Sequence, residues 1–145
     1  MAEENFVGRT VAVTGHRTLE NINEAKLEEI FKVLIKKGYN RFLVGMAIGF
    51  DTLCFNILEK LREKHEIKII ACIPCLEQDK YFTESQKTEY ARMFSEKYTS
   101  YCMHRRNCYM VDKSSVLVAY LRKSFGGTYN TVKYAEKQKK LIVNI

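Results

Sequence analysis

Short apolar runs alternate along this chain with longer segments in which apolar residues recur every three or four positions. The short runs end at a glycine, a proline or a polar turn, which predicts buried strands over 10–13, 41–44, 68–73, 115–120 and 141–143. The longer segments predict amphipathic helices between a capping signal at 21–24 and Gly38, over 53–65, and over 128–139.

The pattern is least regular between residues 76 and 104. It predicts a helix over 84–94 and a short extended piece over 98–102, and the segment 105–113 again has helical spacing. This stretch interrupts an otherwise regular alternation of strands and helices.

Such an alternation predicts an α/β fold, because parallel strands need a crossover connection that is usually a helix. We therefore expect a mostly parallel sheet with helices on both faces. The 145 residues contain no repeat, linker or composition break, so one domain over 1–145 is expected. In such sheets ligands bind beyond the carboxyl ends of the strands.

The composition narrows the range of partners. Lys and Arg number 24 against 17 Asp and Glu, a formal net charge of +7 that favours a nucleotide, a nucleic acid or an anionic surface. The longest apolar stretch, 69–76, is too short to span a bilayer, and the acidic start shows no signal-peptide pattern. Five cysteines without secretory features fit a reducing cytosol. We expect a soluble cytoplasmic protein without a membrane partner.

The loop after the first strand carries residues suited to an anion. Gly15 lets backbone N–H groups approach a phosphate, and Arg17 can contact its oxygens. His16 can donate to a phosphate or act as a general base. A plain turn with a solvated arginine is an equally good interpretation of this loop alone.

The second loop joins the strand at 41–44 to a helix with the spacing Gly45-x-x-x-Gly49-x-Asp51. Free amides and the helix dipole at this helix start favour an anion. Asp51 can cap the helix, or accept a hydrogen bond from a ribose or a base. The spacing matches neither the dinucleotide-binding nor the P-loop pattern, so ordinary turn chemistry is the alternative.

The third loop precedes the last predicted helix and reads Gly126-Gly127-Thr128-Tyr129-Asn130-Thr131. Glycines with hydroxyl and amide side chains at a helix start can cradle a phosphate, and Thr128 as a plain N-cap is the alternative. Because all three loops leave the same edge of one parallel sheet, we expect them to hold one ligand.

A basic tetrad, His104-Arg105-Arg106-Asn107, is predicted at the head of a short helix. Two arginines at a helix N-terminus oppose the dipole, which favours an anion-binding role over a solvated helix start.

The cysteines raise the question of a metal site. Cys72 and Cys75 form a C-x-x-C pair that could bind zinc together with Cys102, His104 and Cys108. The second group lacks a tight pair, and Cys72 lies in an apolar strand where cysteine behaves as a small hydrophobe. We therefore favour structural cysteines and expect no metal.

These segments resemble those of the SLOG superfamily of Rossmann-like proteins. Residues 44–52 are similar to its Gly-x-Ala-x-Gly-x-Asp segment, and 13–17 to the opening of its YpsA-like branch. Arg106-Asn107, an apolar strand and Gly126-Gly127-Thr128 follow in the family's order. The superfamily also holds the DNA-processing Smf/DprA proteins and the Lonely Guy nucleotide hydrolases. The resemblance covers 10–145 and implies a Rossmann-like three-layer fold with a nucleotide or nucleotide-derived ligand in these loops.

One segment departs from the hydrolase branch. Lonely Guy enzymes, which cleave the base from a nucleoside monophosphate, carry Pro-Gly-Gly-x-Gly-Thr-x-x-Glu with a catalytic glutamate. Here Phe125 precedes the glycines, Tyr129 replaces the third glycine, and Lys133 stands in place of the glutamate. A lysine cannot stabilise an oxocarbenium-like centre as a carboxylate can, so enzymatic activity stays open. The candidate catalytic residues of a hydrolase are Asp51, Asp112, Glu136 and His16.

Three hypotheses follow. The first is a small protein that binds a nucleotide or an ADP-ribose-like ligand and needs no cofactor; the second is a hydrolase of an N-glycosidic bond; the third is a binder of single-stranded nucleic acid. A homo-oligomer is an open alternative for each. The expected ligand contacts are Gly15, His16, Arg17, Gly45, Gly49, Asp51, Arg106, Asn107, Gly126, Gly127, Thr128, Asn130 and Thr131.

Overall fold

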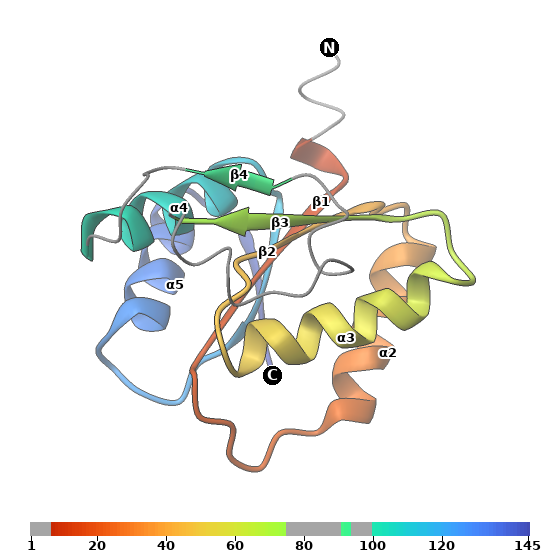
Figure 1. Ribbon diagram of the computed structural model, residues 1–145, viewed down its shortest axis with the longest axis horizontal. Coiled ribbons are helices and arrows are strands. Elements are labelled where there is room, and N and C mark those ends of the chain that lie inside the picture. The colour runs from red at the N-terminus through yellow and green to blue at the C-terminus, as the bar shows by residue number, and fades with distance from the viewer. Residues whose placement is uncertain (1–6, 75–90, 94–99) are drawn as a thin grey trace.

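A computed structural model of the chain describes residues 7–74, 91–93 and 100–145. In this part of the chain, six strands form one parallel sheet in the order β4-β3-β2-β1-β5-β6 (Figure 1). The strands are β1 (Thr10–Gly15), β2 (Arg41–Val44), β3 (Lys68–Ile73), β4 (Ala91–Met93), β5 (Val116–Tyr120) and β6 (Leu141–Asn144). The helices are α2 (Glu24–Lys36), α3 (Phe50–Arg62), α4 (Ser100–Asp112) and α5 (Gly127–Lys137). None of the helices described here is long and apolar enough to cross a membrane.

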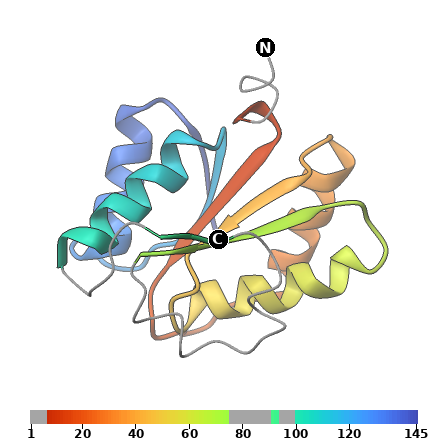
Figure 2. The same cartoon turned by 45° about the horizontal axis from the view of Figure 1, so that its top comes forward.

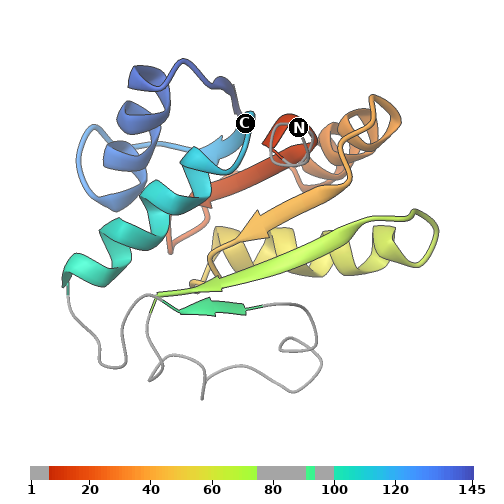
Figure 3. The same cartoon turned by 90° about the horizontal axis from the view of Figure 1, so that it is seen from above.

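The sheet lies between two pairs of helices, with α2 and α3 on one face and α4 and α5 on the other (Figure 2; Figure 3). Successive side chains of a strand point to opposite faces of a sheet. Val11 and Val13 of β1 therefore join the core under α2 and α3, whereas Ala12 joins the core under α4 and α5. This arrangement confirms the predicted three-layer α/β fold.

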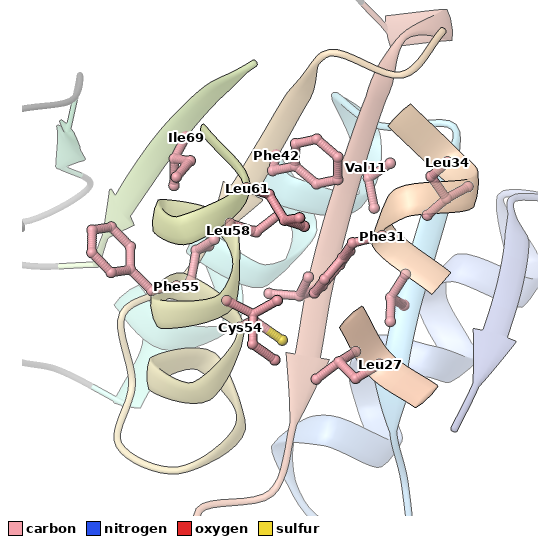
Figure 4. Packing of buried hydrophobic residues seen from close by; sticks show 14 of the residues in the cluster. Val11, Leu27, Phe31, Leu34, Phe42, Cys54, Phe55, Leu58, Leu61 and Ile69 are labelled. Atoms are coloured by element: carbon pink, nitrogen blue, oxygen red, sulfur yellow. The ribbon is translucent and has the colours of Figure 1, made fainter. Parts of the chain in front are cut away.

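Apolar stripes on α2 and α3 fill the core on their face of the sheet (Figure 4). Leu27, Phe31 and Leu34 follow one another at helical spacing on α2, and all three are buried. Phe31 meets Phe42 of β2 edge to face, with ring centroids 5.7 Å apart. The spacing seen in the sequence therefore places these residues as predicted.

Two expectations for the middle of the chain are wrong. Residues 91–93 form a strand instead of part of a helix, because they pair in parallel with 71–73 on the outer edge of β3. Residues 100–102 begin a helix rather than an extended piece, since α4 starts at Ser100. The other residues of the predicted helix at 84–94, and residues 98 and 99, lie outside the described part of the chain.

The buried face of α4 explains why its beginning is hard to predict. Cys102, Arg106 and Met110 lie one turn apart and are 1%, 3% and 3% exposed. An arginine in the middle of this stripe hides the helical period of the apolar residues. Because α4 starts at Ser100, the basic tetrad begins at the fifth helical residue and not at the head of the helix, as expected.

The strand order brings the loops after β1, β2 and β5 together. The chain leaves β1 towards β2 on one side of the sheet, and β5 adds on the other side of β1. In open parallel sheets, the ligand crevice forms at the carboxyl edge where the strand order reverses in this way.

Tyr120, the last residue of β5, holds this edge together. Its ring is 1% exposed and stacks on Phe50 with centroids 5.8 Å apart. Its hydroxyl accepts the Glu20 backbone N–H at 2.7 Å and donates to the Glu20 carbonyl at 2.5 Å. One side chain therefore fastens the β1–α2 loop to β5 and α3.

The substitution Tyr120→Phe removes the hydroxyl but keeps the ring on Phe50. Because both hydrogen bonds to Glu20 are lost, we expect the free energy of unfolding to fall by about 1–2 kcal/mol in urea denaturation. Tyr101→Phe is the matched control: Tyr101 is 68% exposed, and the expected change is below about 0.5 kcal/mol. Equal stability of the two variants would show that water replaces the Tyr120 hydroxyl at Glu20.

Candidate functional site

A crevice of about 580 Å³ opens at the carboxyl edge of the sheet, and all three glycine loops contribute to its wall. The lining residues, which define the crevice, are Val13, Thr14, Gly15, Arg17, Met46, Ala47, Ile48, Asp51, Met103, Arg106, Asn107, Gly127 and Thr128. A second hollow, at the opposite edge, receives none of the three loops and is lined by Gly8, Arg9, Lys37, Gly38 and Tyr39.

Two helix N-termini face the crevice, and among the described residues neither has a side-chain cap. The N-cap residues are Gly49 for α3 and Gly126 for α5, whereas α2 is capped by the Asn23 side chain. The first backbone N–H groups of a helix have no intrahelical acceptor and carry its positive dipole end. Gly127 and Thr128, at the start of α5, therefore offer N–H groups at the crevice wall.

The third loop is open towards solvent at its glycines. A Cβ atom on Gly126 or Gly127 would meet nothing within 4 Å, and Gly126 has φ +95°. Thr128 follows the N-cap by two positions, so the plain N-cap alternative for Thr128 is wrong. Thr131 donates its hydroxyl to the Gly127 carbonyl at 2.8 Å inside the helix, and Asn130 is exposed; neither lines the crevice.

The glycines at the end of β1 and before α3 serve close packing inside the protein. A Cβ atom on Gly15 would overlap the Phe50 side chain. A Cβ atom on Gly49, whose φ is +97°, would overlap the Arg17 backbone. Phe50 also donates its backbone N–H to the His16 carbonyl at 3.2 Å. The β1–α2 loop therefore packs directly on the beginning of α3, which places Arg17 at the crevice.

Gly45 makes room for a buried pair of opposite charges. A Cβ atom at this position would lie 2.8 Å from both the Arg106 Nη1 and the Asp51 Oδ2 atoms. Arg106 donates from Nη1 to the Gly45 carbonyl at 2.5 Å and to the Cys72 carbonyl at 3.2 Å. Its Nε donates to the Asn107 side-chain oxygen at 2.7 Å. Arg106 thereby anchors α4 on the ends of β2 and β3.

Asp51 is the one carboxylate among the described residues that line the crevice. It is 6% exposed, and its Oδ2 accepts the Ala47 backbone N–H at 3.2 Å. Burial raises the pKa of Asp51 from 3.8 to about 6, although the Arg106 charge and the Ala47 N–H act in the opposite direction. Its Oδ1 is buried and has no hydrogen-bond partner among the described residues.

His16 does not line the crevice and is already used by the fold. Its Nε2 accepts the Arg122 backbone N–H at 2.8 Å, which ties the β1–α2 loop to the segment between β5 and α5. Partial burial lowers the pKa of His16, and the charges of Lys123 and Arg122 lower it further. A neutral ring with Nε2 as acceptor therefore fits the structure, and that nitrogen is not available as a general base while the hydrogen bond persists.

The other two candidate carboxylates lie outside the crevice. Asp112, at the end of α4, accepts a hydrogen bond from the Tyr134 hydroxyl at 2.7 Å. This bond is the main cause that raises the pKa of Tyr134 to about 12. Glu136 forms an exposed ion pair with Lys133 on α5 at 3.4 Å. Of the four candidate catalytic residues, Asp51 alone lines the crevice.

The structure brings together about half of the expected ligand contacts. Those that line the crevice are Gly15, Arg17, Asp51, Arg106, Asn107, Gly127 and Thr128. Those that do not are His16, Gly45, Gly49, Gly126, Asn130 and Thr131.

Sequence reasoning missed an apolar part of the crevice wall. Met46, Ala47 and Ile48 come from the β2–α3 loop, and Met103 comes from α4. Ile48 is 63% exposed, so its apolar side chain is accessible to a ligand at this wall. The signal was available, because these three loop residues stand between the two glycines of a motif expected to surround a ligand.

The zinc alternative is not tested, because Cys75 lies outside the described residues. In the described ranges, no three His, Cys, Asp or Glu residues are grouped so that they could hold a metal ion. Cys72 and Cys102 are buried, and the Cys108 Sγ lies 3.6 Å from the His104 Nε2.

The different roles of the glycines predict different effects of alanine. Gly15→Ala forces the Phe50 ring aside, so we expect a loss of about 1–3 kcal/mol in the free energy of unfolding. Gly127→Ala adds a methyl group in open space on a helix, so stability should stay equal or rise by up to about 1 kcal/mol. Urea denaturation of both variants measures the difference, and a Gly15→Ala variant as stable as the wild type would contradict the packing role.

The raised pKa of Asp51 predicts how the free energy of unfolding depends on pH. Its raised pKa means that the folded state binds the proton more tightly than the unfolded chain. The resulting stabilisation is complete below about pH 4 and is lost as the pH rises through about 6, a change of about 3 kcal/mol. Asp51→Asn should remove this loss, which urea denaturation between pH 4 and 7 detects. The titration of His16 contributes equally to the wild type and to Asp51→Asn. Identical pH profiles of the free energy of unfolding for the two proteins would therefore refute the raised pKa of Asp51.

Comparisons with known proteins agree with this fold. The model of the family YpsA, described as the YspA SLOG family, matches residues 11–143. The uncharacterized SPbeta prophage-derived protein YoqJ of Bacillus subtilis (strain 168) is 31% identical, over 83% of each chain.

Two solved structures are similar in fold. DNA processing protein A (DprA) from Streptococcus pneumoniae has a TM-score of 0.76 and 18% identity, over 94% of this chain and 50% of that one. DNA processing protein A from Helicobacter pylori has a TM-score of 0.68 and 20% identity, over 98% of this chain and 66% of that one. This chain thus spans about half to two thirds of those proteins. Since the family model covers residues 11–143, the chain belongs to the YspA SLOG family.

Proposed function

We propose that this protein binds a nucleotide or a nucleotide-derived small molecule in the crevice. The observation that carries the proposal is the uncapped N-terminus of α5 at the crevice wall, where Gly127 and Thr128 present backbone N–H groups. Helix N-termini of this kind favour phosphate, because the N–H groups and the dipole act together. Arg17, which is exposed on the lining of the same crevice, adds a positive charge for a phosphate oxygen.

Apolar side chains in the crevice lining suit the uncharged part of a nucleotide. Met46, Ile48 and Met103 supply an apolar surface on which a base can lie. A volume of about 580 Å³ is within the range of small-molecule sites. Anion-binding groups and apolar side chains in one crevice favour a nucleotide over inorganic phosphate.

The hydrolase alternative has less support. Hydrolysis of a glycosidic bond generally uses two carboxylates near the scissile bond. Among the described residues, the candidates Asp112 and Glu136 lie outside the crevice, and Asp51 remains as a single carboxylate in it. Hydrolase activity is therefore the weaker alternative, and it is tested by whether a bound ligand is recovered cleaved.

Single-stranded nucleic acid is the second candidate ligand. Both fold neighbours are DNA processing proteins, and the one from Helicobacter pylori is described with a single-stranded DNA binding mode. In this chain the β5–α5 loop, beside the crevice, carries Arg122, Lys123 and an exposed Phe125, with the Lys123 Nζ 5.8 Å from the Phe125 ring centre. Cations beside an exposed aromatic ring are typical of surfaces that contact a strand by stacking and phosphate binding.

Gly127→Leu tests the proposed site directly. A leucine side chain there would project from the start of α5 into open space and obstruct the N–H groups, so we expect at least a tenfold loss of affinity without loss of the fold. Gly8→Leu is the matched control, because a Cβ atom on Gly8 also meets nothing within 4 Å and Gly8 lies at the opposite edge.

The measurement is isothermal titration with nucleoside mono- and diphosphates, ADP-ribose, NAD and a single-stranded oligonucleotide, with mass spectrometry of the recovered ligands. Small-molecule binding that Gly127→Leu weakens supports the proposal, and a cleaved ligand would identify an enzyme. Binding of the oligonucleotide alone, weakening steeply with salt, would favour the second candidate. Equal affinity of Gly127→Leu and Gly8→Leu would refute the placement of the phosphate.

A further inference from the structure

The loop between β5 and α5 leads the chain to the start of α5, and few contacts hold it. Residues 122–127 are all exposed, so packing does little to fix their position. Arg122 donates its backbone N–H to the His16 Nε2 atom at 2.8 Å. In residues 123–126, no backbone N–H group donates to another part of the chain that the structure describes. The bond to His16 is therefore the last hydrogen bond that ties the described main chain to another segment before α5 begins.

His16 is itself held by the packing at this edge of the sheet. Its ring meets the Tyr120 ring edge to face, with centroids 5.9 Å apart. Its carbonyl accepts the Phe50 backbone N–H at 3.2 Å, and the preceding residue, Gly15, packs directly on the Phe50 side chain. A ring that is placed in this way offers the loop an acceptor at a fixed position.

We infer that His16 is a positioning residue of the crevice, because its bond to the Arg122 backbone fixes the start of α5 where a phosphate binds. The inference rests on the proposed nucleotide function and adds a means of controlling it. His16 does not touch the ligand in this scheme. It acts through the loop that places the Gly127 and Thr128 backbone N–H groups at the crevice wall.

Protonation of His16 acts against this bond in two ways. An imidazolium carries hydrogen on both ring nitrogens, so Nε2 can no longer accept the Arg122 N–H. The new positive charge also repels the side chains of Arg122 and Lys123. Partial burial lowers the pKa of His16, and the charges of Lys123 and Arg122 lower it further, so the neutral, accepting form is favoured. Acidification should therefore release the loop and weaken binding of a phosphate.

Other titratable groups surround His16 and must be separated from it. Those on its own loop, on α3, on β5 and on the β5–α5 loop are Arg17, Glu20, Asp51, Tyr120, Arg122 and Lys123. Asp51 titrates in the same pH range, since burial raises its pKa to about 6. Its protonation removes negative charge from the crevice, which favours an anion, and this effect is the same in every variant of His16.

The sign of the pH dependence separates positioning from direct contact. A histidine that touched the phosphate would attract it more strongly when protonated, so affinity would rise on acidification. A histidine that holds the loop loses its bond when protonated, so affinity falls. The comparison with a variant that cannot titrate at position 16 isolates this contribution.

The first arm of the test measures the affinity for adenosine 5′-monophosphate and for ADP-ribose between pH 5 and pH 8. His16→Leu has no acceptor, and we expect about tenfold weaker binding at pH 8. His16→Gln places an amide oxygen where Nε2 stands, so its affinity at pH 8 should stay within about twofold of the wild type. From pH 8 to pH 5, the wild type should lose up to about tenfold more affinity than His16→Gln.

The matched control is His65→Leu. His65 is exposed after the end of α3 and does not line the crevice, so this variant should bind like the wild type at each pH. A thermal melt of each variant checks the fold. If His16→Leu does not fold, the comparison of the wild type with His16→Gln still decides the inference.

The second arm needs no ligand and uses trypsin, which cleaves after arginine and lysine. Arg122 and Lys123 are both exposed, so cleavage after them reports how firmly the loop is held. At pH 8, His16→Leu should be cut there several times faster than the wild type, and His16→Gln at the rate of the wild type. Mass spectrometry of the fragments identifies the two sites.

The outcomes separate this inference from the proposed function. If the probes bind but His16→Leu binds them as tightly as the wild type, the role of His16 is refuted and the nucleotide site stands. Affinity that rises on acidification more in the wild type than in His16→Gln, or equal trypsin cleavage of the wild type and His16→Leu, also refutes it. If neither probe binds the wild-type protein, the proposed function falls and the inference falls with it.

Discussion

The packing of the β1–α2 loop on the start of α3 is the contact on which the crevice depends. Gly15 lies against Phe50, and Gly49 lies against the Arg17 backbone, so no side chain separates the two segments. This approach places Arg17 and Asp51 on the same crevice. Phe50 also stacks on Tyr120, which extends the packing to the end of β5 and to the loop that leads to α5. Gly15 and Gly49 therefore build the site by allowing this close packing.

Electrostatics at the crevice follow from burial more than from net charge. The formal charge of +7 is spread over the chain, whereas the groups at the crevice are few and enclosed. Arg106 is 3% exposed and uses its donors on the carbonyls of Gly45 and Cys72, so it stabilises the ends of β2 and β3. Asp51 lies beside it with a raised pKa, because the cost of burying its charge exceeds the attraction of Arg106.

Much of the fold could be predicted from periodicity, and part of the site could not. The strands β1, β2, β3, β5 and β6 are short apolar runs, and a local pattern reveals them. The strand at 91–93 is not local in origin, since it exists through hydrogen bonds to β3. Similarly, the glycine motifs predicted which loops form the crevice wall. Only the three-dimensional structure shows that Gly45 makes room for Asp51 and Arg106, whereas the space around Gly127 is empty.

The sequence by itself determined the parallel α/β architecture, the edge at which the loops meet, and the resemblance to the SLOG superfamily. These follow from the order of strands, helices and glycines, which is a one-dimensional property. Tertiary structure decided which polar side chains line the crevice and which hold the backbone in place. His16 and Arg106 carry side chains typical of catalysis and phosphate binding, yet they hold backbone groups of distant segments. The backbone partner of His16 lies 106 positions away in the sequence, and the Gly45 carbonyl lies 61 positions from Arg106. No local sequence pattern reveals contacts over such separations.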